Sequence, residues 1–178
     1  MKKIVWTFGL IAGGILGGMT AVLTPLGANG AVKLDHAEIF GYTIMVLSFL
    51  LVFFGIRSYR ENVGGGSVTF GKAFQVGILV TLIASAAYVV SWEIVYYNFV
   101  PDFGDKYAAH TLEKMKMAGK SAAAIEAATK EMARFKELYR NPLYNVGMTF
   151  MEVFPVGLVV TLVSAAILRR RAQAASPA

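Results

Sequence analysis

Two carboxylates lie inside long apolar stretches of the sequence, and their type and position make them the first candidates for chemistry. Glu93 and Glu152 are the only acidic residues in these stretches, which contain no lysine or arginine. A carboxylate within a membrane span is costly, so it is usually paired, protonated or exposed to a water-filled cavity. We therefore begin the search for a functional site at these two glutamates.

The two glutamates are predicted to lie at matching depths. Glu93 is about two helical turns before Pro101, and Glu152 is nearly three turns after Pro142. Antiparallel helices would bring both carboxylates toward the same side of the membrane. Glu38, at the start of the second apolar stretch, and both histidines are expected on that side too. The candidate set for binding an ion or a proton is Glu38, Glu93, Glu152, His36 and His110.

Three uses of these carboxylates remain open at the level of sequence. Two close carboxylates can share a proton, because like charges raise one pKa. They can bind a cation through oxygen ligands, with a histidine as an additional ligand. The third use is purely structural: the carboxylates hydrogen-bond to nearby hydroxyl groups and hold the helices together. Hydroxyl groups are available on Tyr42, Tyr88, Tyr96 and Ser91. No helical His-Glu-x-x-His spacing occurs, so neither a metal enzyme nor a cofactor is predicted.

The elements that position these residues are four apolar stretches, at 4–26, 39–56, 74–100 and 143–168. Each is long enough to cross a hydrocarbon core of about 30 Å as a helix. The chain has 178 residues, of which 16% are charged, whereas a soluble domain carries about 25%. The first stretch also exceeds the core of a signal peptide, which has about 7–15 residues. We expect a single domain, 1–178, with four transmembrane helices.

Basic residues at the ends of the spans predict the orientation. Three groups fall on one side by alternation: Lys2 and Lys3; Arg57, Arg60 and Lys72; and Arg169, Arg170 and Arg171. By the positive-inside rule both termini are cytoplasmic, although mixed charges at 102–141 weaken the contrast. This distribution, rather than one basic face, excludes nucleic acid as the reason for the net charge of +6. The absence of cysteine excludes disulfides, thiolate catalysis and a lipid anchor on cysteine.

The segment 102–141 is predicted to form an extracytoplasmic helical hairpin between the third and fourth spans. Its first helix should end at Gly119, and Ser121 can cap the second. The second helix carries an apolar stripe suited to packing on its partner: Ile125, Ala128, Met132, Phe135 and Tyr139. Residues 172–178 are expected to be a disordered cytoplasmic tail. Aromatic residues near span ends are predicted to lie at the membrane interface: Trp6, Trp92, Tyr96, Tyr97 and Tyr144.

The first span carries a stripe of glycines with Gly-x-x-x-Gly spacing: Gly9, Gly13, Gly14, Gly17 and Gly18. Such glycines allow another helix to approach closely. The stripe predicts either packing against another span of the same chain or the seam of a homodimer. Within the chain, a row of small residues in the third span can face it: Ala73, Gly77, Thr81 and Ser85.

Several short runs resemble a known family. They are Gly41-Tyr42, Phe54 to Arg60, Phe70 to Phe74, Trp92 to Tyr96, Phe135 to Glu137 followed by Asn141-Pro142, and Glu152 to Gly157. Together they resemble the bacterial domain-of-unknown-function family numbered forty-one ninety-nine, over nearly the whole chain. The resemblance implies a small four-span protein of the bacterial inner membrane. It implies no activity, ligand or functional residue.

Two functions are compatible with these features. The first is a non-enzymatic accessory or envelope protein that binds a partner through its helices, in the lipid bilayer, as a homo-oligomer or with another membrane protein. The alternative is a small ion- or proton-coupled transporter that uses Glu93 and Glu152 as a pair. No nucleophile with an adjacent base is evident in the sequence, so an enzyme is not expected.

Overall fold

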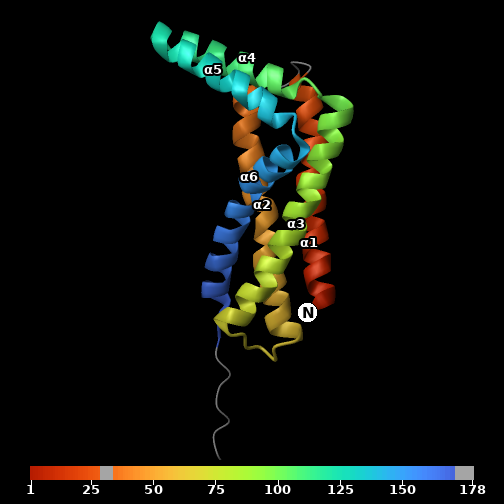
Figure 1. Cartoon of the computed structure of the whole chain (residues 1–178). Helices are drawn as coiled ribbons and strands as arrows, with labels where there is room; N and C mark the ends of the chain where they lie inside the picture. Colours follow the sequence, from red (N-terminus) through yellow and green to blue (C-terminus); the bar gives the residue numbers. More distant parts are fainter. Residues whose placement is uncertain (29–33, 171–178) are drawn as a thin grey trace, which may run out of the picture.

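The computed structural model describes residues 1–28 and 34–170, except for the side chains of 28–38. Within these ranges the chain forms six helices and no strand beyond one isolated bridge. The helices are α1 (Lys2–Ala28), α2 (Leu34–Asn62), α3 (Phe70–Phe99), α4 (Phe103–Met117), α5 (Ala122–Tyr139) and α6 (Pro142–Leu168). Four of them form an elongated bundle, and α4 and α5 lie across one end of it (Figure 1). The all-helical prediction is confirmed.

Helices α1, α2, α3 and α6 are long and apolar enough to cross a membrane, as predicted. Their apolar segments contain 26, 24, 30 and 27 residues, whereas about 20 suffice. The predicted tail 172–178 and the side chains of His36 and Glu38 lie outside the described residues.

Three of the five glycines in the predicted stripe of α1 pack against α3. A Cβ added at Gly9 would lie 2.8 Å from the Ile83 side chain, and one at Gly13 would lie 2.5 Å from the Cβ of Ala87. A Cβ at Gly17 would meet Ser91 in the same way. The glycines therefore set the close approach of α1 and α3. Gly14 and Gly18 have no such neighbour within 4 Å.

The row of small residues on α3 does not face the glycines, so that part of the prediction is wrong. A Cβ at Gly77 would meet Thr161 of α6 at 2.8 Å and Ile56 of α2 at 2.9 Å. The Thr81 hydroxyl forms a hydrogen bond of 2.9 Å with the Thr161 hydroxyl. Small residues on α3 thus occupy two faces, and this row serves the contact with α2 and α6.

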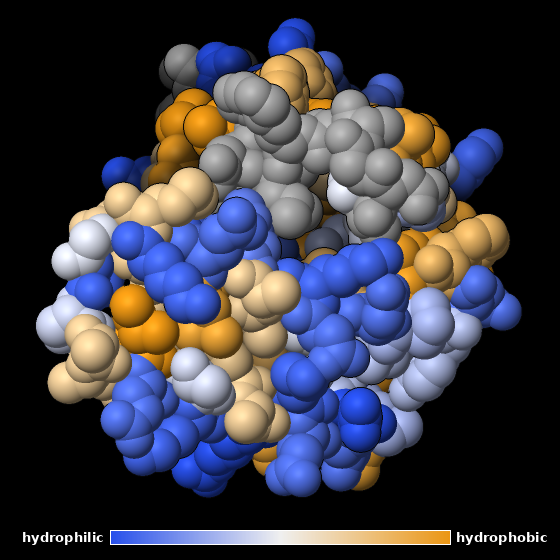
Figure 2. All heavy atoms as spheres, turned by 90° about the horizontal axis from the view of Figure 1, so that it is seen from above, coloured by the Kyte–Doolittle hydropathy of each residue, from blue (hydrophilic) through white to orange (hydrophobic). Residues whose placement is uncertain are grey.

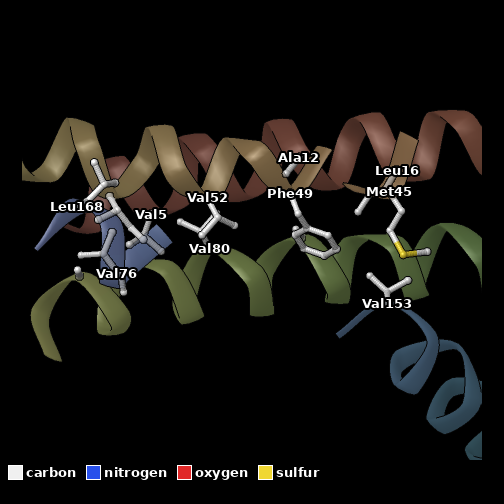
Figure 3. Close-up of a cluster of buried hydrophobic side chains, with 14 of the residues drawn as sticks. Val5, Ala12, Leu16, Met45, Phe49, Val52, Val76, Val80, Val153 and Leu168 are labelled. Carbon is white, nitrogen blue, oxygen red and sulfur yellow. The ribbon is translucent and has the colours of Figure 1, made fainter. Parts of the chain in front are cut away.

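A second glycine completes this junction from the side of α6. A Cβ at Gly157 would lie 2.5 Å from the Thr81 methyl group and 2.6 Å from the Phe49 ring. Figure 3 shows Phe49 and Val52 extending from α2 toward α3, where Val80 lies. These side chains belong to a continuous apolar core along the bundle.

The end of the bundle away from α4 and α5 is tied together by backbone hydrogen bonds. The Val68 amide donates to the Arg170 carbonyl at 2.9 Å, and the Arg170 amide donates to the Val68 carbonyl at 2.8 Å. This bridge joins the α2–α3 connection to the end of α6. The connection turns through Gly65 and Gly66, whose positive φ angles of 58° and 83° favour glycine.

Helices α4 and α5 pack against each other through charged and aromatic contacts. The Lys136 ammonium of α5 contacts the Asp105 carboxylate of α4. The rings of Tyr107 and Phe135 lie 5.7 Å apart between centroids. Ser121 caps α5 by accepting a hydrogen bond from the Ala124 amide at 3.3 Å, as predicted. Seen from above, this end of the molecule is largely hydrophilic around a smaller apolar area (Figure 2).

Candidate functional site

A cavity of about 930 Å³ lies at the end of the bundle that α4 and α5 cover. All six described helices contribute to its wall. The wall comprises Met19, Thr20, Leu23, Thr24, Gly27, Gly41, Tyr42, Met45, Tyr88, Trp92, Val100, Phe103, Lys106, Tyr107, Ala109, His110, Glu113, Phe135, Tyr139, Met148, Thr149 and Glu152. It is mainly apolar and aromatic, with a few charged groups. Sites for small molecules have this composition and volumes of about 300–1,000 Å³.

A hydrogen-bond network fixes the inner aromatic wall. The Trp92 indole N–H donates to the Asn145 side-chain oxygen at 2.9 Å, and the Thr149 hydroxyl donates to the same oxygen at 3.3 Å. Both Trp92 and Asn145 are buried. The Trp92 ring meets Phe103 edge to face at 4.9 Å. Because its N–H is bound and its ring is packed, Trp92 holds one orientation at the cavity wall.

Aromatic residues of α4 and α5 continue this wall. Tyr139 packs on Phe135 with centroids 5.0 Å apart and on Tyr96 with centroids 5.5 Å apart. Burial raises the pKa of the Tyr139 hydroxyl, so this group is neutral at physiological pH. Tyr139 thus offers the cavity an uncharged phenol and links α5 to α3.

Trp92 and Tyr96, which were predicted to lie at the membrane interface, are packed against protein and not exposed to headgroups. Each is only 6% exposed, because α4, α5 and the start of α6 cover this part of α3. By contrast, Trp6 and Tyr97 are 55% and 52% exposed, as residues facing lipid and headgroups would be.

Glu152 borders the cavity together with His110. No hydrogen bond or ion pair to the Glu152 carboxylate occurs among the described residues. Of the three candidate residues whose side chains are described, Glu152 and His110 are the two that border this common space.

Glu93 does not border this cavity. It follows Trp92 by one residue, which turns its side chain by about 100° around α3. Its Oε1 atom is buried and has no hydrogen-bond partner within the part of the chain that is described. The two glutamates are therefore not gathered at one cavity, and the described residues contain no group of three or more acidic or histidine side chains suited to a metal ion.

The aromatic wall is the part of the site that the sequence analysis missed. A signal was present, because Tyr88 and Trp92 are four residues apart on one helix and share a face. Tyr139 belongs to the apolar stripe predicted for the second helix of 102–141. Nothing in the sequence indicates that these two faces meet over a hollow rather than over filled space.

Comparison with known proteins places the chain in a family. A family model described as a protein of unknown function (DUF4199) matches residues 7–170. The chain belongs to this family. The match covers α2, α3, α6 and most of α1, and it confirms the resemblance seen in the short sequence runs. No curated protein and no solved structure matches the chain significantly.

Proposed function

We propose that this chain is a non-enzymatic accessory protein of the bacterial inner membrane that binds an amphiphilic small molecule. The observation that supports this function is the cavity of about 930 Å³ between the four long helices and the α4–α5 pair. Its wall combines apolar side chains with a small number of polar groups, as amphiphile sites do. Its inner part lies within apolar helices, so a lipophilic molecule can reach it from the bilayer.

The proposed orientation has both termini in the cytoplasm and α4–α5 as a helical hairpin on the extracytoplasmic side. Basic residues support it, because Arg57, Arg60, Lys72 and Arg170 belong to the end where Val68 and Arg170 form their bridge. The cavity would then open toward the outer leaflet.

The state of the lining hydroxyls supports a binding role over a catalytic one. The Thr20 hydroxyl donates to the Leu16 carbonyl at 3.1 Å, and the Thr149 hydroxyl donates to the Asn145 side chain. A nucleophilic hydroxyl would instead be hydrogen-bonded to a general base. The alternative function, a transporter with paired glutamates, gains no support, since Glu93 does not border the cavity that Glu152 lines.

The test fills the cavity without disturbing the packing. Gly41 lines the cavity, and a Cβ added there would meet nothing within 4 Å. We expect Gly41→Trp to fold and to lose binding. The probe is a lysophosphatidylcholine that carries a photoreactive diazirine on its acyl chain. In the unaltered protein, mapped crosslinks should concentrate on α3, α5 and α6 at the cavity wall and should be saturable.

A matched control uses another open glycine. Gly18→Trp adds the same side chain to α1 at a position that has no neighbour within 4 Å and does not border the cavity. We expect it to retain the crosslinks. Equal, unsaturable labelling of the lipid-facing surfaces in all three proteins would refute the proposed function.

A further inference from the structure

Among the described residues that border the cavity, carboxyl groups outnumber ammonium groups. The Lys106 ammonium is already neutralised, because it lies 3.0 Å from the Asp102 carboxylate in the turn below it. Glu152 and Glu113 also border the cavity, and no cation among the described residues pairs with Glu152. A ligand that carries positive charge would therefore meet, on the inner wall, a carboxyl group that no described cation neutralises.

Aromatic rings line much of the cavity that this carboxyl group borders. Tyr88, Trp92, Phe103, Tyr107 and Tyr139 all border the cavity. Aromatic faces attract a cation within about 6 Å, and the attraction grows when the site is desolvated. Rings contributed by three different helices, α3, α4 and α5, provide this attraction from several directions.

A bare metal ion does not fit the cavity. Such an ion needs several oxygen or nitrogen ligands, and no group of three acidic or histidine side chains occurs in the described part of the chain. Glu152 lies ten residues into α6, about 15 Å from its start, where a strongly hydrated ion would have to shed its water. An organic cation is weakly hydrated and loses far less on entry.

The position of Tyr42 suggests how such a ligand enters. Tyr42 borders the cavity and also a shallow hollow on the outer face of α2 formed with Thr43, Val46 and Leu47. Its side chain is 56% exposed. Because Tyr42 borders both spaces, movement of its side chain would let a lipophilic molecule pass from the bilayer beside α2.

We propose that the cavity binds a lipophilic organic cation, with Glu152 as the counter-charge and the rings of Tyr88, Trp92 and Tyr107 around the positive centre. This inference rests on the proposed function and names the class of its ligand. It applies equally to a free lipophilic cation and to the quaternary ammonium group of a lipid.

The experiment compares two ions of nearly the same shape and opposite charge. Binding of tetraphenylphosphonium and of tetraphenylborate to the protein in maltoside micelles is measured by equilibrium dialysis. The Gly41→Trp variant, whose cavity is filled, gives the amount of each ion that dissolves in the micelles alone. We expect saturable binding of the phosphonium and none of the borate. Glu152→Gln should weaken phosphonium binding by about tenfold or more, and Glu93→Gln, away from the cavity, should leave it unchanged.

The possible outcomes distinguish failure of this inference from failure of the proposed function on which it rests. Saturable binding of both ions with equal affinity would overturn the preference for a cation and leave the cavity as a site. Binding of neither ion, together with no saturable crosslinking by the photoreactive lysolipid, would remove both proposals. If choline competes with the phosphonium, the ligand is a quaternary headgroup; if it does not, the ligand is a free lipophilic cation.

A second variant tests the aromatic half of the site should Glu152→Gln fail to fold. Tyr107 is 41% exposed on α4, outside the long apolar helices, so Tyr107→Leu leaves the core of the bundle intact. We expect a severalfold loss of phosphonium affinity in this variant. Unchanged affinity would contradict the role of the rings.

Discussion

At the scale of single residues, α1 shows how glycines with the same spacing serve different faces. Gly9, Gly13 and Gly17 lie against α3, whereas Gly14 and Gly18 face away from the bundle. Of the two interpretations left open by the sequence, packing within the chain therefore applies to the first three. Assembly with a second copy through the outer pair stays a prediction.

Replacing Gly13 by leucine should destabilise the protein. The first side-chain atom alone would lie 2.5 Å from the Ala87 Cβ and 3.3 Å from the Ala84 backbone, which cannot move without shifting α3. Overpacking of this kind costs about 1–3 kcal/mol, so the thermal midpoint in detergent should fall by several degrees.

The control for this change is Gly14→Leu, one position along the same helix. No atom lies within 4 Å of a Cβ at that position. We expect its midpoint to stay near that of the unaltered protein, since leucine also favours a helix over glycine. Equal destabilisation by the two leucines would show that the α1–α3 contact differs from the one described.

At the scale of the elements, the sequence predicted the helices well and their neighbours poorly. Apolar length determines a spanning helix, and Ser121 and Pro142 mark helix starts through local chemistry, so these features were predictable. Which face of α3 meets α1 depends on how the helices cross. The choice of Gly77 and Thr81 for that face was therefore wrong.

The same limit applies to the candidate site. Glu152 was predictable because an acid within an apolar stretch stands out in the sequence. The burial of Trp92 and Tyr96 was not predictable, because it depends on where the α4–α5 pair lies against the bundle. The cavity arises from that placement, so no local pattern indicates it.

The α4–α5 pair should loosen in acid. The hydrogen bond from Lys136 lowers the pKa of the Asp105 carboxyl below its usual value near 4. The Asp105 pKa is lower in the folded protein than in the unfolded chain. The ion pair therefore stabilises the fold fully at a pH above the unfolded-state pKa, and this stabilisation is lost as the pH falls through the folded-state pKa. Amide exchange of α4 and α5, corrected for its intrinsic pH dependence, should show less protection at about pH 3 than at about pH 6.

Two variants identify the cause of this loosening. Asp105→Asn should lower the protection of the α4 and α5 amides from exchange at the higher pH. It should also reduce the additional loss of protection on going to acid. Glu126→Gln should change neither, because Glu126 pairs with Lys130 of the same helix and joins no second element. A full acid response in Asp105→Asn would assign the loosening to other groups.

At the scale of the whole molecule, the absence of cysteine makes the orientation directly measurable. Val63, in the α2–α3 connection, is 53% exposed, and Lys120, between α4 and α5, is exposed. With a membrane-impermeant maleimide on intact spheroplasts, Lys120→Cys should react. Val63→Cys should react only after permeabilisation. The reverse pattern would place the termini and the basic connections outside the cell.

The bridge between Val68 and Arg170 also bears on the order of biogenesis. Synthesis begins at the N-terminus, so α1, α2 and α3 are complete before Arg170 leaves the ribosome. Until α6 arrives, Thr81 and Gly77 face a vacant groove, and the α2–α3 connection lacks its backbone partner. The final span therefore fills the groove and supplies the backbone partner of the α2–α3 connection at once, and a nascent chain that stalls before it presents an incomplete bundle to the insertion and quality-control machinery.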